Sequence, residues 1–162
     1  LNFPSYNARE SAIQQLIQVA GRAGRSTLKN SQVIVQVLKE HPVFEYLSEE
    51  KYLDFCKTEF EARKMCGYPP FGRLLRIEIK SKTETLLDEE SEKVSKILFE
   101  SMEKQGLKLS VLGPAKPPVF KLQGVHVRHI LIKADSFDSI HKLLNGLNDI
   151  PFYSSITFNP II

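Results

Sequence analysis

Leu75-Arg76-Ile77-Glu78-Ile79-Lys80 is the stretch that decides the fold of the C-terminal part of this chain. Apolar and charged residues alternate along it, which is the period of two expected of a half-buried strand. Apolar residues then recur at helical spacing from about Thr85 to Gln105, and Gly106 follows as a C-terminal stop. The sequence therefore predicts a strand followed by a long helix.

More strands and a second helix are predicted after this pair. We expect strands at residues 107–112 and 125–134, a short run at 119–122, and a last strand at 156–158. Ser136 predicts the start of a helix that reaches Asn145-Gly146. The order strand, helix, strand, strand, helix, strand is the ferredoxin-like pattern (βαββαβ) of an α+β sandwich. Residues 71–162 are therefore predicted to form a ferredoxin-like C-terminal domain.

The first 41 residues are predicted to form a helix followed by a buried strand. Asn7 and Glu10 fit a capping box, and the apolar spacing that follows predicts a helix ending near Arg22–Arg25. Residues 33–38 are apolar on nearly both faces and predict a buried strand of an α/β lobe. Residues 1–41 are therefore interpreted as the end of such a lobe.

A connecting segment is predicted between these two parts. A helix is expected to begin at Ser48 and to stop at Gly67. Pro69-Pro70 cannot continue a helix and favours an extended link. Residues 42–70 are therefore interpreted as a connecting helix and a Pro-Pro linker.

Gln18-Val-Ala-Gly21-Arg22-Ala-Gly24-Arg25 requires a chemical explanation beyond packing. Arg22 and Arg25 lie about one turn apart on one side of a helix, and the glycines leave room for a bulky anion. Paired arginines are suited to hold a triphosphate and to neutralise charge on a transferred phosphoryl group. The spacing is equally compatible with a structural role, because cations favour the C-terminal end of a helix dipole.

This motif resembles motif VI of the superfamily 2 helicases, Q-x-x-G-R-x-G-R, at every defining position. Other stretches resemble the PriA family of primosomal replication-restart helicases, and the likeness covers nearly the whole chain. These stretches are Leu1-Asn-Phe-Pro4, Glu61-x-Arg63, Tyr68-Pro69-Pro70-Phe71, Gly113-Pro114-Ala115 and Lys121-Leu-x-Gly124-x-x-x-Arg128-His129. The resemblance implies the end of a RecA-like α/β helicase lobe before the ferredoxin-like domain.

The resemblance also implies roles for the motif residues. Arg22 and Arg25 would be catalytic, and Gln18, Gly21 and Gly24 would contact the nucleotide. The cofactor would be ATP with Mg, bound mainly by parts of a longer parent protein, because this sequence has no phosphate loop and no Asp-Glu box. The chain alone should therefore be inactive. The family carries a zinc region, but the sequence predicts no metal site here.

The implied parent is an ATP-dependent 3′-to-5′ DNA helicase that recognises stalled replication forks and promotes primosome assembly and replication restart. Its partners would be forks, primosome loader proteins and single-stranded DNA-binding protein. The helix after Ser136 is the candidate to hold the acidic tail of that last protein, although Phe137 and His141 replace basic or amide residues found in the family. No apolar run reaches the ~18–20 residues that cross a bilayer, and we expect a cytoplasmic protein.

The stretch from Lys104 to Ala134 contains six lysines and arginines and no acidic residue. Such a stretch favours contact with the phosphate backbone, so Lys116, Lys121 and Arg128 are predicted to bind DNA. A plain solvated surface is the alternative.

The composition is that of an ordinary globular protein, and the two cysteines are predicted not to form a disulfide with each other. The 162 residues are 42% hydrophobic and 25% charged, as in an ordinary globular chain. Cys56 and Cys66 are predicted on one helix, about 15 Å apart, and cannot pair with each other. Two other functions remain open: another superfamily 2 motor such as a RecG-like branch-migration enzyme, and a non-enzymatic nucleic-acid or protein-binding module.

Overall fold

The alternating stretch around Ile77 forms β1 (Arg73–Ser81) in the computed structural model, which describes residues 6–23, 33–37, 39–148 and 150–161. Leu75, Ile77 and Ile79 are buried, as the period of two predicts. The chain divides into two compact units, Leu1–Ala62 and Arg63–Ile162, and β1 belongs to the second.

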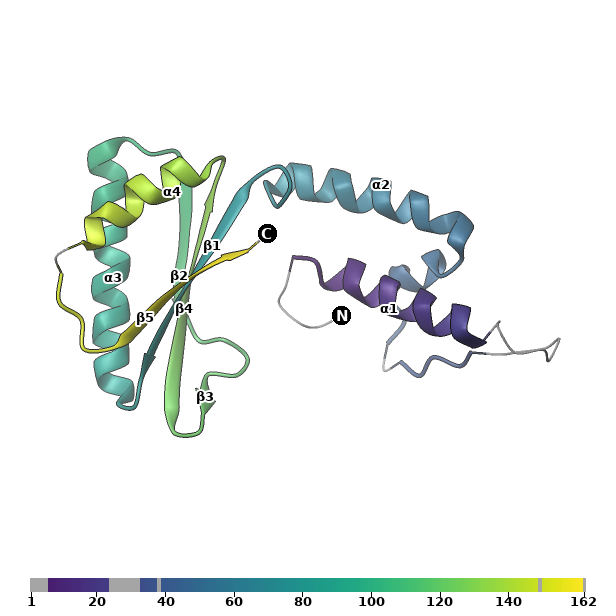
Figure 1. Ribbon diagram of the computed structural model, residues 1–162, viewed down its shortest axis with the longest axis horizontal. Coiled ribbons are helices and arrows are strands. Elements are labelled where there is room, and N and C mark those ends of the chain that lie inside the picture. The colour runs from purple at the N-terminus through teal and green to yellow at the C-terminus, as the bar shows by residue number, and fades with distance from the viewer. Residues whose placement is uncertain (1–5, 24–32, 38, 149, 162) are drawn as a thin grey trace. The chain divides into compact units, whose positions relative to one another are not determined.

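The second unit is built on an antiparallel sheet in the order β2-β4-β1-β5 (Figure 1). β1 lies between β4 (Val125–Ala134) and β5 (Ser155–Ile161), and Ile77 pairs with Ile130 on one side and Phe158 on the other. β2 (Leu109–Ala115) pairs with the other edge of β4, and the short β3 (Lys121–Leu122) pairs with the beginning of β4. Every paired strand is antiparallel.

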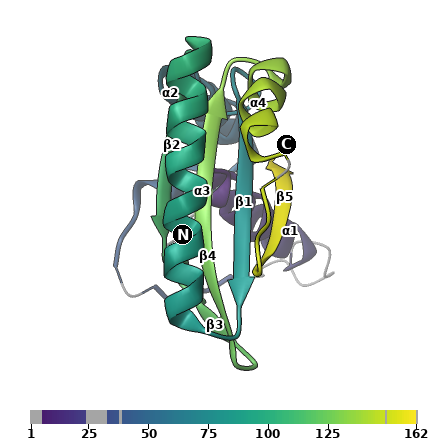
Figure 2. The same ribbon diagram turned by 90° about the vertical axis from the view of Figure 1, so that its left-hand side faces the viewer.

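Two helices cover one face of this sheet, as Figure 2 shows. They are α3 (Glu84–Gln105) and α4 (Phe137–Leu144), which the short 3-10 helix η2 (Asn145–Leu147) follows. The core between helices and sheet includes fully buried Ile77, Leu98, Ile130 and Leu143. Gly106 ends α3 at φ 61°, in the left-handed region that glycine tolerates, so the predicted stop is confirmed. The second unit is therefore an α+β fold with an antiparallel sheet.

The first unit contains α1 (Ala8–Ala23), the 3-10 helix η1 (Pro42–Tyr46) and most of α2 (Glu49–Cys66). Its core joins one residue from each: Ile13, Val43 and Phe55 are buried together. Ser48 precedes α2 and Gly67, at φ 60°, follows it, as predicted.

Residues 33–37 do not form the buried strand that their apolar pattern predicts. They are exposed, with Ile34 at 90%, and Leu38 lies outside the described residues. A strand requires a neighbour for its backbone hydrogen bonds. None of the described residues before Ala62 forms a strand, so this segment has no sheet to join.

The segment after α2 is a tight turn instead of the predicted extended link. The N–H groups of Phe71 and Gly72 both donate to the carbonyl of Tyr68, at 2.9 and 3.2 Å. A Cβ on Gly72 would lie 2.2 Å from the carbonyl oxygen of Gly67. The absence of a side chain at Gly72 therefore allows the chain to turn back on itself.

Candidate functional site

The end of α1 that carries the helicase-like motif is exposed. Ile13 anchors the first half of the helix in the core, whereas residues 18–22 are all exposed. Gln18, Gly21 and Arg22 therefore project from the part of α1 that packs least. Gly24 and Arg25 lie outside the described residues, so the predicted pairing of Arg22 with Arg25 on one helix face stays a prediction.

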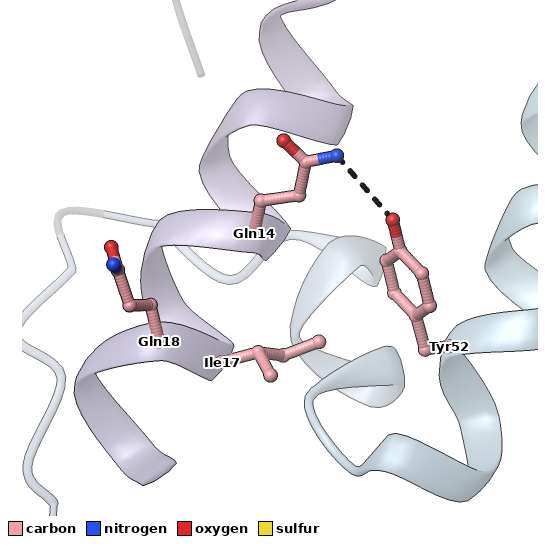
Figure 3. A pocket seen from close by; sticks show the side chains of 4 residues that line it. All are labelled: Gln14, Ile17, Gln18 and Tyr52. Atoms are coloured by element: carbon pink, nitrogen blue, oxygen red, sulfur yellow. Dashed lines mark hydrogen bonds between the residues drawn. The ribbon is translucent and has the colours of Figure 1, made fainter. Parts of the chain in front are cut away.

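A small open pocket lies between α1 and α2 beside this motif (Figure 3). It has a volume of about 280 Å³ and is lined by Gln14, Ile17, Gln18 and Tyr52, mostly through apolar atoms. The amide Nε2 of Gln14 lies 3.4 Å from the hydroxyl of Tyr52 and 3.1 Å from Oε1 of Glu10. These contacts fix Gln14 one turn before Gln18 and leave the Gln18 side chain exposed.

Gly21 has open space where a side chain would stand. An added Cβ would meet no atom within 4 Å. Packing within the described part of the chain therefore gives no reason for glycine in this helix, where it costs up to ~1 kcal/mol relative to alanine. Close approach of a group from outside these residues would explain it.

Arg128 lies beneath the first turns of α3 and is only 3% exposed. Its Nε donates to Oδ1 of Asp88 at 2.7 Å, and a terminal nitrogen donates to Oε1 of Glu84 at 2.9 Å. Lys116 also contacts Glu84, at 3.1 Å. Hydrogen bonds from Arg128, and next from Lys116, lower the pKa of Glu84 from 4.5 to about 2.

These contacts bear on the prediction that the stretch without acidic residues, Lys104 to Ala134, binds DNA. Arg128, predicted to contact DNA, is buried and bonded to carboxylates, so it offers no donor at the surface while those pairs hold. Lys116 is exposed but shares Glu84, and only Lys121 of the three predicted residues is exposed with no ion pair among the described residues. The acids come from α3, which precedes the basic stretch in sequence and packs over β4 in space.

Glu90 is a buried acidic residue of α3 that the sequence analysis does not single out. It is 6% exposed, and its two carboxylate oxygens accept the N–H groups of Tyr153 and Ser154, both at 2.7 Å. Burial acts to raise its pKa, but the hydrogen bonds from Ser154 and Tyr153 outweigh burial, so the pKa is lowered. Glu90 therefore fixes the segment before β5 and has a structural role. Its place on the same face of α3 as Leu87 and Val94 was the signal available in the sequence.

The described residues offer no cluster of three or more histidine, cysteine, aspartate or glutamate side chains that would hold a metal ion. Cys56 and Cys66 are both free thiols. Within the same ranges, no helix has the length and apolar character to cross a lipid bilayer.

Comparisons with known proteins identify the family. The family described as primosomal protein N C-terminal domain, or PriA_C, matches residues 64–154, which is more than half of the chain. The chain belongs to the PriA family. The PriA match begins beside Arg63, where the second compact unit starts, and it stops directly before β5.

Individual PriA proteins match almost the whole chain. The replication restart protein PriA of Chlamydia pneumoniae is 33% identical over 90% of this chain and 19% of its own length. The PriA protein of Synechocystis sp. is 26% identical over 99% of this chain and 19% of its own length. The chain thus spans about a fifth of these curated relatives. Among solved structures, the de novo designed protein Foldit4 matches 56% of this chain and 97% of its own, at 17% identity and a TM-score of 0.40, which is too low to carry an argument about fold.

Proposed function

We propose that this chain is the C-terminal part of an ATP-dependent DNA helicase that restarts replication at stalled forks. The observation that carries the proposal is the PriA domain match at residues 64–154, together with relatives named replication restart protein PriA. In the parent, ATP hydrolysis drives 3′-to-5′ unwinding, and recognition of the fork leads to primosome assembly.

The exposed end of α1 would serve the ATP site. Arg22 and Arg25 would contact the phosphates and stabilise charge as the terminal phosphoryl group leaves, since arginine keeps its charge and presents several fixed donors. Gln18 would position these groups, and the open space at Gly21 leaves room for a nucleotide. Mg²⁺ bound with the ATP neutralises charge on the phosphate oxygens. The rest of the parent would hold most of the nucleotide.

Two features support a finer description of the fold. The strand order β2-β4-β1-β5, with both helices on one face, is the arrangement expected of a ferredoxin-like βαββαβ domain with β3 as an addition to its central hairpin. The exposed and mostly apolar segment 33–37 is suited to complete a sheet of a RecA-like lobe in the parent.

The proposal extends to partners and cofactors of the parent. It includes forked DNA, primosome loader proteins and single-stranded DNA-binding protein as partners, zinc in another region, and action in the cytoplasm. α4 is the candidate to hold the acidic tail of single-stranded DNA-binding protein, and Arg73 lies near its start, with the guanidinium 5.7 Å from the ring centre of Phe137.

The decisive experiment changes Arg25 to alanine in the full-length parent. Loss of an arginine that stabilises the transition state reduces turnover by ~10³–10⁵. ATPase and unwinding rates should therefore collapse, while fork binding, measured by fluorescence anisotropy, should remain. Gln15→Ala is the matched control, because Gln15 is exposed on α1 but lies outside the motif.

A normal ATPase rate in the Arg25→Ala protein would reject the catalytic role. The motif would then be a basic helix end that favours the helix dipole, and the chain would be a non-enzymatic binding module. The chain by itself should show no ATP turnover in either case, so any DNA-stimulated turnover from it would also contradict the proposal.

A further inference from the structure

The hairpin formed by β3 and the beginning of β4 carries a group of exposed apolar side chains in the second unit. Lys121 pairs with His126 and Leu122 pairs with Val125, and the connecting residues Gln123 and Gly124 have φ of 50° and 79°. Two consecutive residues with positive φ are typical of the tight two-residue turn that matches the twist of the strands. The hairpin is therefore narrow and well defined, and Figure 1 shows it reaching beyond the end of β1.

Three large apolar side chains are exposed on this hairpin and on the segment before it. Val119 is 63% exposed, Phe120 is 44% exposed and Leu122 is 64% exposed. Paired residues of an antiparallel ladder point to the same face, so Leu122 shares a face with Val125 and Lys121 shares the other with His126. Because residues i and i+2 share a face, Phe120 lies on the side of Leu122. The hairpin thus has one apolar face that includes an aromatic ring and one face that carries a lysine.

The charges around Phe120 are positive. The Nζ of Lys116 lies 5.7 Å from the centre of the Phe120 ring. No aspartate or glutamate occurs between Lys104 and Ala134. Glu84 reaches Lys116 from α3, but no acidic side chain in the described parts of the chain pairs with Lys121. An exposed ring with Lys116 beside it, and with Lys121 on the other face of the same hairpin, complements a base and its backbone phosphates better than it complements an apolar protein surface.

We propose that this hairpin binds single-stranded nucleic acid by stacking an unpaired base on Phe120 and placing an adjacent phosphate near Lys121. The inference rests on the proposed function, since a helicase at a fork provides unpaired DNA. Of the residues predicted from the sequence to bind DNA, the proposal keeps Lys121. It assigns the second contact to Phe120 and not to the buried Arg128. A paired base within a duplex has no free face to offer a single aromatic ring, so single strands should bind better than blunt duplex.

The test uses the 162-residue chain without ATP and a single-stranded oligonucleotide labelled for fluorescence anisotropy. Stacking on an aromatic side chain contributes about 1–3 kcal/mol per base, so Phe120→Ala should weaken binding by roughly 5- to 150-fold. Lys121→Ala should reduce the slope of log affinity against log salt by about 0.7. An oligonucleotide containing 2-aminopurine should change its fluorescence on binding the unaltered chain, and this change should be lost with Phe120→Ala.

Two controls separate a contact from a folding defect. Phe99 is 39% exposed on α3, so Phe99→Ala removes a comparable exposed ring and should leave binding unchanged. Phe120→Trp keeps an aromatic face and should restore binding. Equal binding by the Phe120→Ala and Phe99→Ala chains, or equal binding of blunt duplex and single strand, would overturn the proposal and leave the apolar face to a protein partner. Because no ATP is present, that result would not bear on Arg25 or on helicase activity.

Discussion

Arg128 shows how the surroundings of a residue can differ from its neighbours in sequence. Its own segment is free of acids, yet its guanidinium is bonded to Asp88 and Glu84 of α3. The sequence analysis predicted that Arg128 lies at the surface, because it counted charges along the chain. Such a count does not show which helix packs over which strand. The position of Arg128 could be inferred only from the pairing of β1 with β4, which places it beside Ile79 on the helix-covered face. By contrast, the exposed position of Gln18 and Arg22 follows from a local helical pattern.

At the residue scale we predict how the stability of the second unit depends on Glu84 as the pH falls. The pKa of Glu84 is lowered from 4.5 to about 2 in the folded chain, first by Arg128 and then by Lys116. A lowered pKa stabilises the fold above the unfolded value, and this contribution is lost as the pH falls toward the folded value. Glu84→Gln should therefore lower the urea midpoint at pH 6, and the difference from the unaltered chain should shrink between about pH 4.5 and about pH 2.

Glu89→Gln provides the control for this measurement. Glu89 is exposed on the same helix, so its replacement should leave the urea midpoint nearly unchanged at each pH. A difference between Glu84→Gln and the unaltered chain that stays constant from pH 6 to pH 3 would show that the Glu84 carboxylate does not carry the effect.

At the scale of helices and strands, the correct predictions concern elements with local signals. Each of these signals lies within the element that it specifies or next to it. They are the alternation in β1, the apolar spacing in α3 and the glycine at position 106 that ends α3. The segment 33–37 has an equally clear strand pattern, but such a pattern indicates propensity and cannot supply a neighbouring strand. The tight turn after α2 escaped prediction for a related reason, since it depends on the approach of Gly72 to the backbone of Gly67.

The second prediction concerns the effect of a side chain at Gly72 on the stability of this turn. Gly72→Ala would place a Cβ 2.2 Å from the carbonyl oxygen of Gly67 and 3.4 Å from the carbonyl oxygen of Ala134. These are backbone atoms that cannot rotate away, so the free energy of unfolding should fall by about 1–3 kcal/mol, as for other overpacked sites. Urea unfolding followed by circular dichroism would measure the loss.

Gly106→Ala gives a useful comparison with Gly72→Ala. Gly106 has φ 61° but no atom within 4 Å of an added Cβ. Its replacement tests backbone strain without a clash and should cost about 1 kcal/mol. A Gly72→Ala chain as stable as the unaltered one would mean that the turn can relax without losing its hydrogen bonds.

For the whole molecule, the division into two units follows from their separate cores. The first unit has three buried apolar residues at its centre, Ile13, Val43 and Phe55, whereas the second has a much larger cluster between its sheet and α3 and α4. A small core rarely stabilises a short chain alone. The sequence indicated two parts through its change of pattern near Tyr68, but the sizes of the two cores depend on which residues meet in space.

The third prediction is that the polypeptide Arg63–Ile162 folds by itself. It contains every residue of the larger core, so it should unfold cooperatively in urea and give a dispersed amide NMR spectrum. The polypeptide Leu1–Ala62 should show no cooperative transition. Failure of Arg63–Ile162 to unfold cooperatively would mean that its stability depends on residues of the first unit.

The central position of β1 has a consequence for the timing of folding during synthesis. β1 is the first strand of its sheet to be made, yet both of its neighbours, β4 and β5, come from later in the chain. Pairing between distant segments must first overcome the entropy of closing a long loop. Until β4 and β5 have been synthesised, the backbone edges of β1 have no strand to pair with. The oldest strand of the sheet is therefore the last to have both of its edges paired.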